Sequence, residues 1–163
     1  MTKSPLQFRH NGKDTAVFVE GGENLLSALR GETGDTTLKY GCGQGSCGAC
    51  TVLIDGEIHL SCMTLAETCA GKSVETLDGL ADGPNLHPLQ TAFMENFSAQ
   101  CGFCTSGMLM AAKALLDRNP SPTRDDVIEA IGGNVCRCTG YEPIINAILD
   151  AAGRRSDFSA QRR

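Results

Sequence analysis

The chain has 163 residues, of which 41% are hydrophobic, 20% charged and 5% aromatic. A chain of this length forms one domain or two small ones. Its net charge of −5 argues against the basic surface of a nucleic-acid-binding protein. It shows no apolar run long enough to cross a membrane, and its beginning does not resemble a signal peptide. We therefore expect a cytoplasmic protein that does not insert into membranes.

The first half of the chain predicts two β-hairpins, a short helix and a closing strand. The Asn-Gly at 11–12 and the Asp-Gly at 55–56 are typical of tight turns between two strands. Leu25, Leu26 and Leu29 lie on one face of the expected helix. The expected strands cover 6–9, 15–19, 51–54, 57–61 and 74–77, and the expected helix covers 24–30.

After residue 87 the apolar residues follow a helical period. Leu89, Phe93 and Phe97 are spaced four residues apart, as on one face of a helix. Thr123 begins a capping-box pattern, and Pro143 suits the first turn of a helix. The expected helices cover 88–97, 106–118 and 124–131, and a fourth begins at 143.

Nine cysteines are the most distinctive feature of the composition. An odd count without an export signal does not fit a disulfide scaffold, and clustered cysteines in a reducing cytosol are more often metal ligands. Eight of them form two groups on either side of a turn-rich stretch at 77–85, whereas Cys69 stands alone and is expected to be a small buried residue. The first group is Cys42, Cys47, Cys50 and Cys62, and the second group is Cys101, Cys104, Cys136 and Cys138.

The first group has the spacing of a plant-type 2Fe–2S ferredoxin, C-x4-C-x2-C with a distant fourth cysteine. Such a cluster needs four thiolates, two on each iron, and it is anionic. The glycines of the loop at 41–50 let the backbone direct N–H groups at the sulfurs. The stretch 43–48 also matches G-x-G-x-x-G, but the expected strand at 51–54 follows this loop, so we expect no dinucleotide site.

The second group is C-x2-C followed by C-x-C. Cys101 and Cys104 precede an expected helix, whose positive end faces the thiolates, so we expect a second cluster here. A zinc site with four thiolates stays open as an alternative for this group. Disulfides fit less well, because C-x-C pairs close badly. The C-x2-C-x2-C-x3-C-P pattern of a 4Fe–4S cluster is absent.

Together these patterns predict an α+β fold. An N-terminal plant-type ferredoxin-like β-grasp domain at 1–78 is followed by a linker at 79–87 and by a four-helix bundle at 88–153. Residues 154–163 are expected to form a solvated tail. The three histidines are isolated, and the sequence has no nucleophile elbow or phosphate loop, so we expect no substrate-transforming site on this chain.

These motifs resemble the iron–sulfur subunit of the molybdenum hydroxylases, the family of xanthine dehydrogenase, aldehyde oxidoreductase and bacterial carbon monoxide dehydrogenase. The resemblance covers residues 6–152. It departs from the family at Ser106, where the family has Pro, and at 37–39, where Thr-Leu-Lys replaces the frequent Gly-Thr-Lys. The matching motifs are 41–52, 60–62, 87–90, 100–108 and 133–141.

The resemblance implies a small subunit that relays electrons for a molybdenum-dependent oxidoreductase. The implied partners are a large molybdopterin subunit and often a medium FAD subunit, in a heterotrimer or a dimer of heterotrimers. The pterin is commonly the cytosine dinucleotide form. Electrons would leave molybdenum through the second cluster, then the plant-type cluster, then FAD or another acceptor. Gln100 and Cys138 would lie closest to the pterin, and the helical domain would pack against the large subunit.

Two other functions remain open. The chain fits a free-standing two-cluster ferredoxin that serves several enzymes, in which case it would purify alone. It also fits an interaction module stabilised by zinc, in which case the protein would be colourless.

Overall fold

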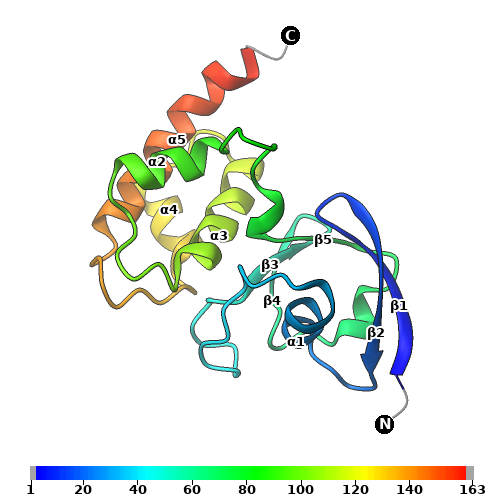
Figure 1. Ribbon diagram of the computed structural model, residues 1–163. Coiled ribbons are helices and arrows are strands. Elements are labelled where there is room, and N and C mark those ends of the chain that lie inside the picture. Colours follow the sequence, from blue (N-terminus) through cyan, green and yellow to red (C-terminus); the bar gives the residue numbers. More distant parts are fainter. Residues whose placement is uncertain (1–2, 161–163) are drawn as a thin grey trace.

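The computed structural model of the protein describes residues 3–160, with side chains described up to residue 153. The strands and α1 gather in one half of the molecule, and the other four α-helices gather in the second half (Figure 1). Each half has its own cluster of buried apolar side chains. The described helices include none with the length and apolar character needed to span a membrane.

Five strands form one mixed sheet in the order β2-β1-β5-β3-β4. Two antiparallel hairpins, β1–β2 and β3–β4, are joined through β5, which runs parallel to β1 and antiparallel to β3. Both hairpins turn at the predicted Asn-Gly and Asp-Gly pairs, whose residues all have positive φ. The strands are β1 (Lys3–His10), β2 (Lys13–Glu20), β3 (Thr51–Ile54), β4 (Glu57–Leu60) and β5 (Ser73–Glu75).

The helix predicted at 24–30 forms as α1 (Leu25–Ala28), and a π-helical turn, η1 (Leu29–Thr33), continues it. Asn24 caps α1 by accepting a hydrogen bond from the N–H of Ser27 at 2.9 Å. The leucines on the predicted face are fully buried in the core of the first half. Burial of these leucines therefore fixes the segment that leads into the first cysteine loop.

Four helices form the second half, and capping boxes begin two of them, of which the sequence predicts the one at Thr123. His87 and Gln90 form one capping box, and Thr123 with Asp126 forms the other. The first of these helices ends two residues before the predicted Phe97. The last one continues to Ala160, into the stretch predicted as a tail, of which 161–163 lie outside the described residues. The helices are α2 (Pro88–Glu95), α3 (Thr105–Arg118), α4 (Arg124–Ile131) and α5 (Glu142–Ala160).

The two halves meet where α3 packs across β3. Leu53 of β3, Met110 and Ala114 of α3 form a small buried cluster of their own. Full burial of a side chain such as Leu53 or Met110 contributes roughly 1.5–3 kcal/mol. At the edge of this contact, Nζ of Lys113 lies 3.1 Å from Oε2 of Glu75. This contact holds the middle of α3 in a fixed position relative to the sheet.

Candidate metal centres

The first four cysteines lie in the loop before β3 and directly after β4. The register of the β3–β4 hairpin pairs Thr51 with Leu60. This pairing places the thiol of Cys50, just before β3, against that of Cys62. The N–H and the hydroxyl of Ser61 both donate to the Cys50 carbonyl, at 3.2 and 2.8 Å. Burial and the neighbouring Cys50 thiol raise the pKa of Cys62 to about 11.

Cys42 is half-buried and receives hydrogen bonds from the backbone of its own loop. The N–H groups of Ser46 and Gln44 donate to its sulfur at 3.3 and 3.5 Å. Gly43 has a φ of 66°, and this left-handed turn brings those N–H groups round to the sulfur. Hydrogen bonds from Ser46, then from the Gln44 N–H, lower the pKa of Cys42 to about 5. The loop therefore stabilises a thiolate, the form in which cysteine binds metals.

The second four cysteines come from two loops of the helical half. Cys101 and Cys104 precede α3, and Cys104 is the N-cap residue of that helix. Cys136 and Cys138 lie in the loop between α4 and α5. The sulfur of Cys138 lies 3.5 Å from that of Cys101. The thiols of Cys104 and Cys136 are hydrogen-bonded to each other.

The environment gives the thiols of Cys104 and Cys136 different pKa values. Burial and the Cys136 thiol raise the pKa of Cys104 to about 12. Burial also acts to raise the pKa of Cys136, but hydrogen bonds from Thr139 outweigh it and bring this pKa down to about 7. The Thr139 hydroxyl oxygen lies 3.1 Å from the sulfur. Metal binding at this pair therefore displaces at least the proton of Cys104.

The eight thiols meet in close pairs. A 2Fe–2S cluster takes four thiolates, two on each iron, so two pairs from one half make a complete ligand set. Among the side chains of residues 3–153, no three Cys, His, Asp or Glu groups are arranged as a site for a single metal ion. Paired thiols in each half fit a two-iron cluster. The pairs are Cys42 with Cys47, Cys50 with Cys62, Cys101 with Cys138, and Cys104 with Cys136.

The second group of cysteines reaches the molecular surface. Cys101, Cys138 and the neighbouring Gln100 are all exposed. The same loops also expose large apolar side chains, which the sequence does not reveal because an exposed and a buried apolar residue look alike in it. These are Phe97, Phe103 and Val135.

Two buried polar side chains have no counterpart among the sequence-based predictions. Asp35 is 6% exposed and accepts a hydrogen bond from the Thr76 hydroxyl. Asn134 is also 6% exposed, and its side-chain amide donates to the Gly48 carbonyl at 2.9 Å. A Gly-Gly-Asn sequence before a C-x-C pair is the signal that points to Asn134. No local pattern marks Asp35.

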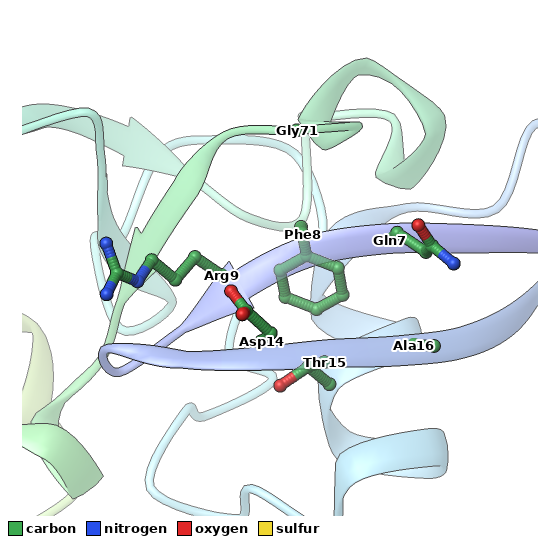
Figure 2. A pocket seen from close by; sticks show the side chains of 7 residues that line it. All are labelled: Gln7, Phe8, Arg9, Asp14, Thr15, Ala16 and Gly71. Carbon is green, nitrogen blue, oxygen red and sulfur yellow. The ribbon is translucent and has the colours of Figure 1, made fainter.

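The remaining candidates do not form a further metal site. Cys69 is fully buried, as predicted, and its burial raises the pKa of the thiol. Figure 2 shows the residues that line a pocket along the β1–β2 hairpin, among them Phe8, Arg9 and Asp14. The residues lining this pocket do not include a cysteine.

Two known domain types match the chain, one in each half. A 2Fe-2S iron-sulfur cluster binding domain matches residues 8–78, and a second type, described as a 2Fe-2S binding domain, matches residues 76–149. The nicotine 6-hydroxylase small subunit of Paenarthrobacter nicotinovorans is 51% identical over 144 residues, which cover 88% of this chain and 87% of that subunit.

Further relatives match this chain over almost the full length of both chains. The nicotinate dehydrogenase small FeS subunit of Eubacterium barkeri is 41% identical over 154 residues, which cover 94% of this chain and 98% of that subunit. The crystal structure of quinoline 2-oxidoreductase from Pseudomonas putida 86 contains a chain with a TM-score of 0.93 and 45% identity, covering 96% of this chain and 98% of that one.

Two cluster-binding halves in one small chain define an iron–sulfur protein of electron transfer. The chain belongs to the small iron–sulfur subunits of the molybdenum hydroxylase family, as the sequence motifs predict. Members of this family work as components of multi-subunit oxidoreductases, beside a large subunit that carries molybdopterin.

Proposed function

We propose that the chain relays electrons through two 2Fe–2S clusters, from the molybdopterin of a large subunit to the FAD of a medium subunit or another acceptor. The observation that carries this proposal is the meeting of eight thiols in four pairs, two in each half. The proposed ligands are Cys42, Cys47, Cys50 and Cys62 for the first cluster, and Cys101, Cys104, Cys136 and Cys138 for the second.

The chain's own residues prepare both sites for anionic groups. Backbone N–H groups of Ser46 and Gln44 point at the Cys42 sulfur, and the Thr139 hydroxyl contacts the Cys136 sulfur. Hydrogen bonds to ligand sulfurs stabilise the additional negative charge that a cluster gains on reduction. The Cys104 thiol lies at the N-terminus of α3, whose dipole acts in the same direction.

We further propose that the second cluster faces the molybdenum subunit. The exposure of Gln100, Cys101 and Cys138 supports this orientation, because an electron donor on another chain must approach the ligands closely. In this arrangement Gln100 and Cys138 contact the pterin, in its cytosine dinucleotide form, and the helical half packs against the large subunit.

For the assembly we propose a heterotrimer with a medium FAD subunit, or a dimer of such heterotrimers, in the cytoplasm. Within the chain we propose domains at 1–78 and 88–153 joined by a linker at 79–87, with α2–α5 as a four-helix bundle. The two separate apolar cores support this division.

Ligand substitutions test the assignment in the purified complex. We expect Cys47→Ser to remove only the EPR signal of the first cluster, and Cys104→Ser to remove only that of the second, because each change deletes one thiolate of one quartet. Cys69→Ala, which removes a cysteine outside both quartets, should retain both signals. Iron and sulfide content should fall to about half in each ligand variant.

Several results would contradict this function. A single ligand substitution that abolishes both signals in a folded protein rules out the division into two quartets. A colourless protein that contains zinc would support the interaction module instead. Purification of the chain without any large subunit would support the free-standing ferredoxin.

A further inference from the structure

The loop that carries the C-x-C pair of the second quartet touches the loop of the first quartet directly. The backbone N–H of Val135 donates to the carbonyl oxygen of Cys47 at 2.9 Å. Val135 is bonded to Cys136 through a peptide bond. Cys47 and Cys136 are proposed ligands of different clusters. They are thus connected through a backbone hydrogen bond and one intervening residue, Val135.

The side chain of Asn134 stabilises this junction, the contact between the two cysteine loops. Its buried side-chain amide donates to the Gly48 carbonyl at 2.9 Å and contacts the Thr51 hydroxyl at 3.3 Å. The same hydroxyl donates to the Gly48 carbonyl at 2.7 Å. A buried amide that loses its partners costs about 1–3 kcal/mol, so these bonds resist separation of the two loops. The Gly48 carbonyl therefore connects both halves of the molecule.

Two glycines allow the close approach at this point. A Cβ added to Gly107, in the first turn of α3, would lie 2.1 Å from the Gly48 carbonyl oxygen. A Cβ added to Gly48 would lie 2.6 Å from the Asn134 amide nitrogen and 2.6 Å from the Gly133 carbonyl oxygen. No side chain fits between these backbones. The first-quartet loop, α3 and the 133–135 segment meet here without any intervening group.

We propose that the Cys47–Val135 hydrogen bond is the electronic bridge between the two clusters, and that Asn134 is the positioning residue that keeps it closed. This inference rests on the ligand assignment proposed above. Electronic coupling weakens less steeply along covalent and hydrogen bonds than across a gap of the same length. One electron lost at the second quartet is gained at the first, and no bond forms and no proton moves.

A second contact offers a competing route, which the experiment must separate from the first. Phe103 lies between Cys101 and Cys104, and a Cβ added to Gly41 would lie 3.6 Å from Cε1 of this ring. Gly41 directly precedes Cys42. Gly41 itself has no Cβ, so this approach joins no pair of atoms as the Cys47–Val135 hydrogen bond does, and we assign the coupling to the Val135 junction.

The bridge is tested in the intact complex carrying both clusters. Gly107→Ala inserts a methyl group at the junction. Asn134→Ala removes the hydrogen bonds that the Asn134 side chain makes with Gly48 and Thr51. Gly153→Ala is the control for the first, because a Cβ at this helical glycine meets nothing within 4 Å. Asn96→Ala is the control for the second, because Asn96 also donates to a backbone carbonyl and a side-chain oxygen. Phe103→Leu tests the competing route.

Two quantities are measured, the rate of electron transfer between the clusters after flash reduction and the EPR splitting between the two reduced clusters. We expect Gly107→Ala and Asn134→Ala to show a several-fold loss of rate and a smaller splitting, with both cluster spectra retained. The two controls and Phe103→Leu should leave both quantities unchanged. The EPR splitting depends on the magnetic coupling between the two reduced clusters. A variant that only loses stability at another position does not alter this coupling.

Unchanged rate and splitting in both junction variants would overturn the proposal. So would a loss of rate in Phe103→Leu alone, which would assign the coupling to the aromatic contact. Loss of the cluster signals in both junction variants would also count against it, because the bridge is assigned to transfer and not to cluster retention. Absence of two 2Fe–2S signals in the unchanged protein would instead refute the proposed function itself.

Discussion

At the scale of single residues, the carboxylate of Asp35 is buried among hydrogen-bond donors. It accepts bonds from the N–H and the hydroxyl of Thr37, at 3.0 and 2.5 Å, and from the hydroxyl of Thr76 at 2.5 Å. Nε2 of His10 lies 3.3 Å from the same group. Burial acts to raise this pKa, but the hydrogen bonds from His10 and the two threonines outweigh it. They hold the pKa of Asp35 well below its usual range.

We expect Asp35→Asn to lower the free energy of unfolding at pH 7 by about 1–3 kcal/mol, because it replaces the charged acceptor. Since the folded-state pKa is depressed, the stabilisation is complete above the unfolded pKa of about 3.9 and is lost as the pH falls through the folded value. The difference in the free energy of unfolding between Asp35→Asn and the unchanged chain should therefore be smaller in acid. Urea unfolding at about pH 7 and about pH 3 measures it. An equal loss in the exposed Asp14→Asn control would contradict this.

The sequence predicts which cysteines group together, because ligand spacing within a loop is a local property. It does not predict Asn134 or Asp35, because their partners are distant in the chain. Asn134 bonds to Gly48 across a separation of 86 residues, and Asp35 bonds to Thr76 across 41. Only the packing of the halves and the closure of the sheet bring these partners together.

At the scale of the elements, α2 ends earlier than its apolar spacing predicts. Phe97 continues the i, i+4 pattern, yet it has a φ of 51° and its side chain is 83% exposed. A left-handed residue cannot belong to the helix, so α2 stops at Glu95. Apolar spacing therefore locates the helix but not its end. The π-helical turn after α1 is likewise a local deviation that periodicity does not indicate.

We expect Phe97→Asn to increase the free energy of unfolding by about 1 kcal/mol, because asparagine tolerates the left-handed region and the exposed ring contributes little burial. Phe18→Asn is the control, since Phe18 is also exposed but lies in β2. Urea unfolding of the three proteins measures the difference. A loss of stability in Phe97→Asn would show that the ring packs more closely than its exposure indicates.

At the scale of the whole molecule, α3 joins the two halves at two places. Its first turn carries Gly107 against the first-quartet loop, and its middle carries Met110 against Leu53 of β3. The two patterns of apolar residues predict the two halves separately, because each follows its own period. The contact between them is not predicted, since Met110 has the same helical spacing as residues that face the core of its own half.

We expect Met110→Ala to lower the free energy of unfolding by about 2–5 kcal/mol, because it leaves a cavity between α3 and the sheet. Met94→Ala, at a side chain that is 67% exposed, should change it by less than about 0.5 kcal/mol. Thermal unfolding followed at the cluster absorbance and by circular dichroism measures both variants. Separate transitions for the two halves in Met110→Ala would show that this contact couples their unfolding, whereas no loss of stability would refute the role of Met110.

The close fit at Gly48 and Gly107 also limits how such chains can be recombined. A chimaera that takes its sheet half from one relative and its helical half from another keeps two sound cores, yet its halves dock as closely as here only if both glycines come with them. A donor with a larger residue at either position would yield a folded hybrid whose halves fit less closely at this contact. The exchange of halves between relatives is therefore restricted by the need for glycine at these two positions rather than by the cysteines.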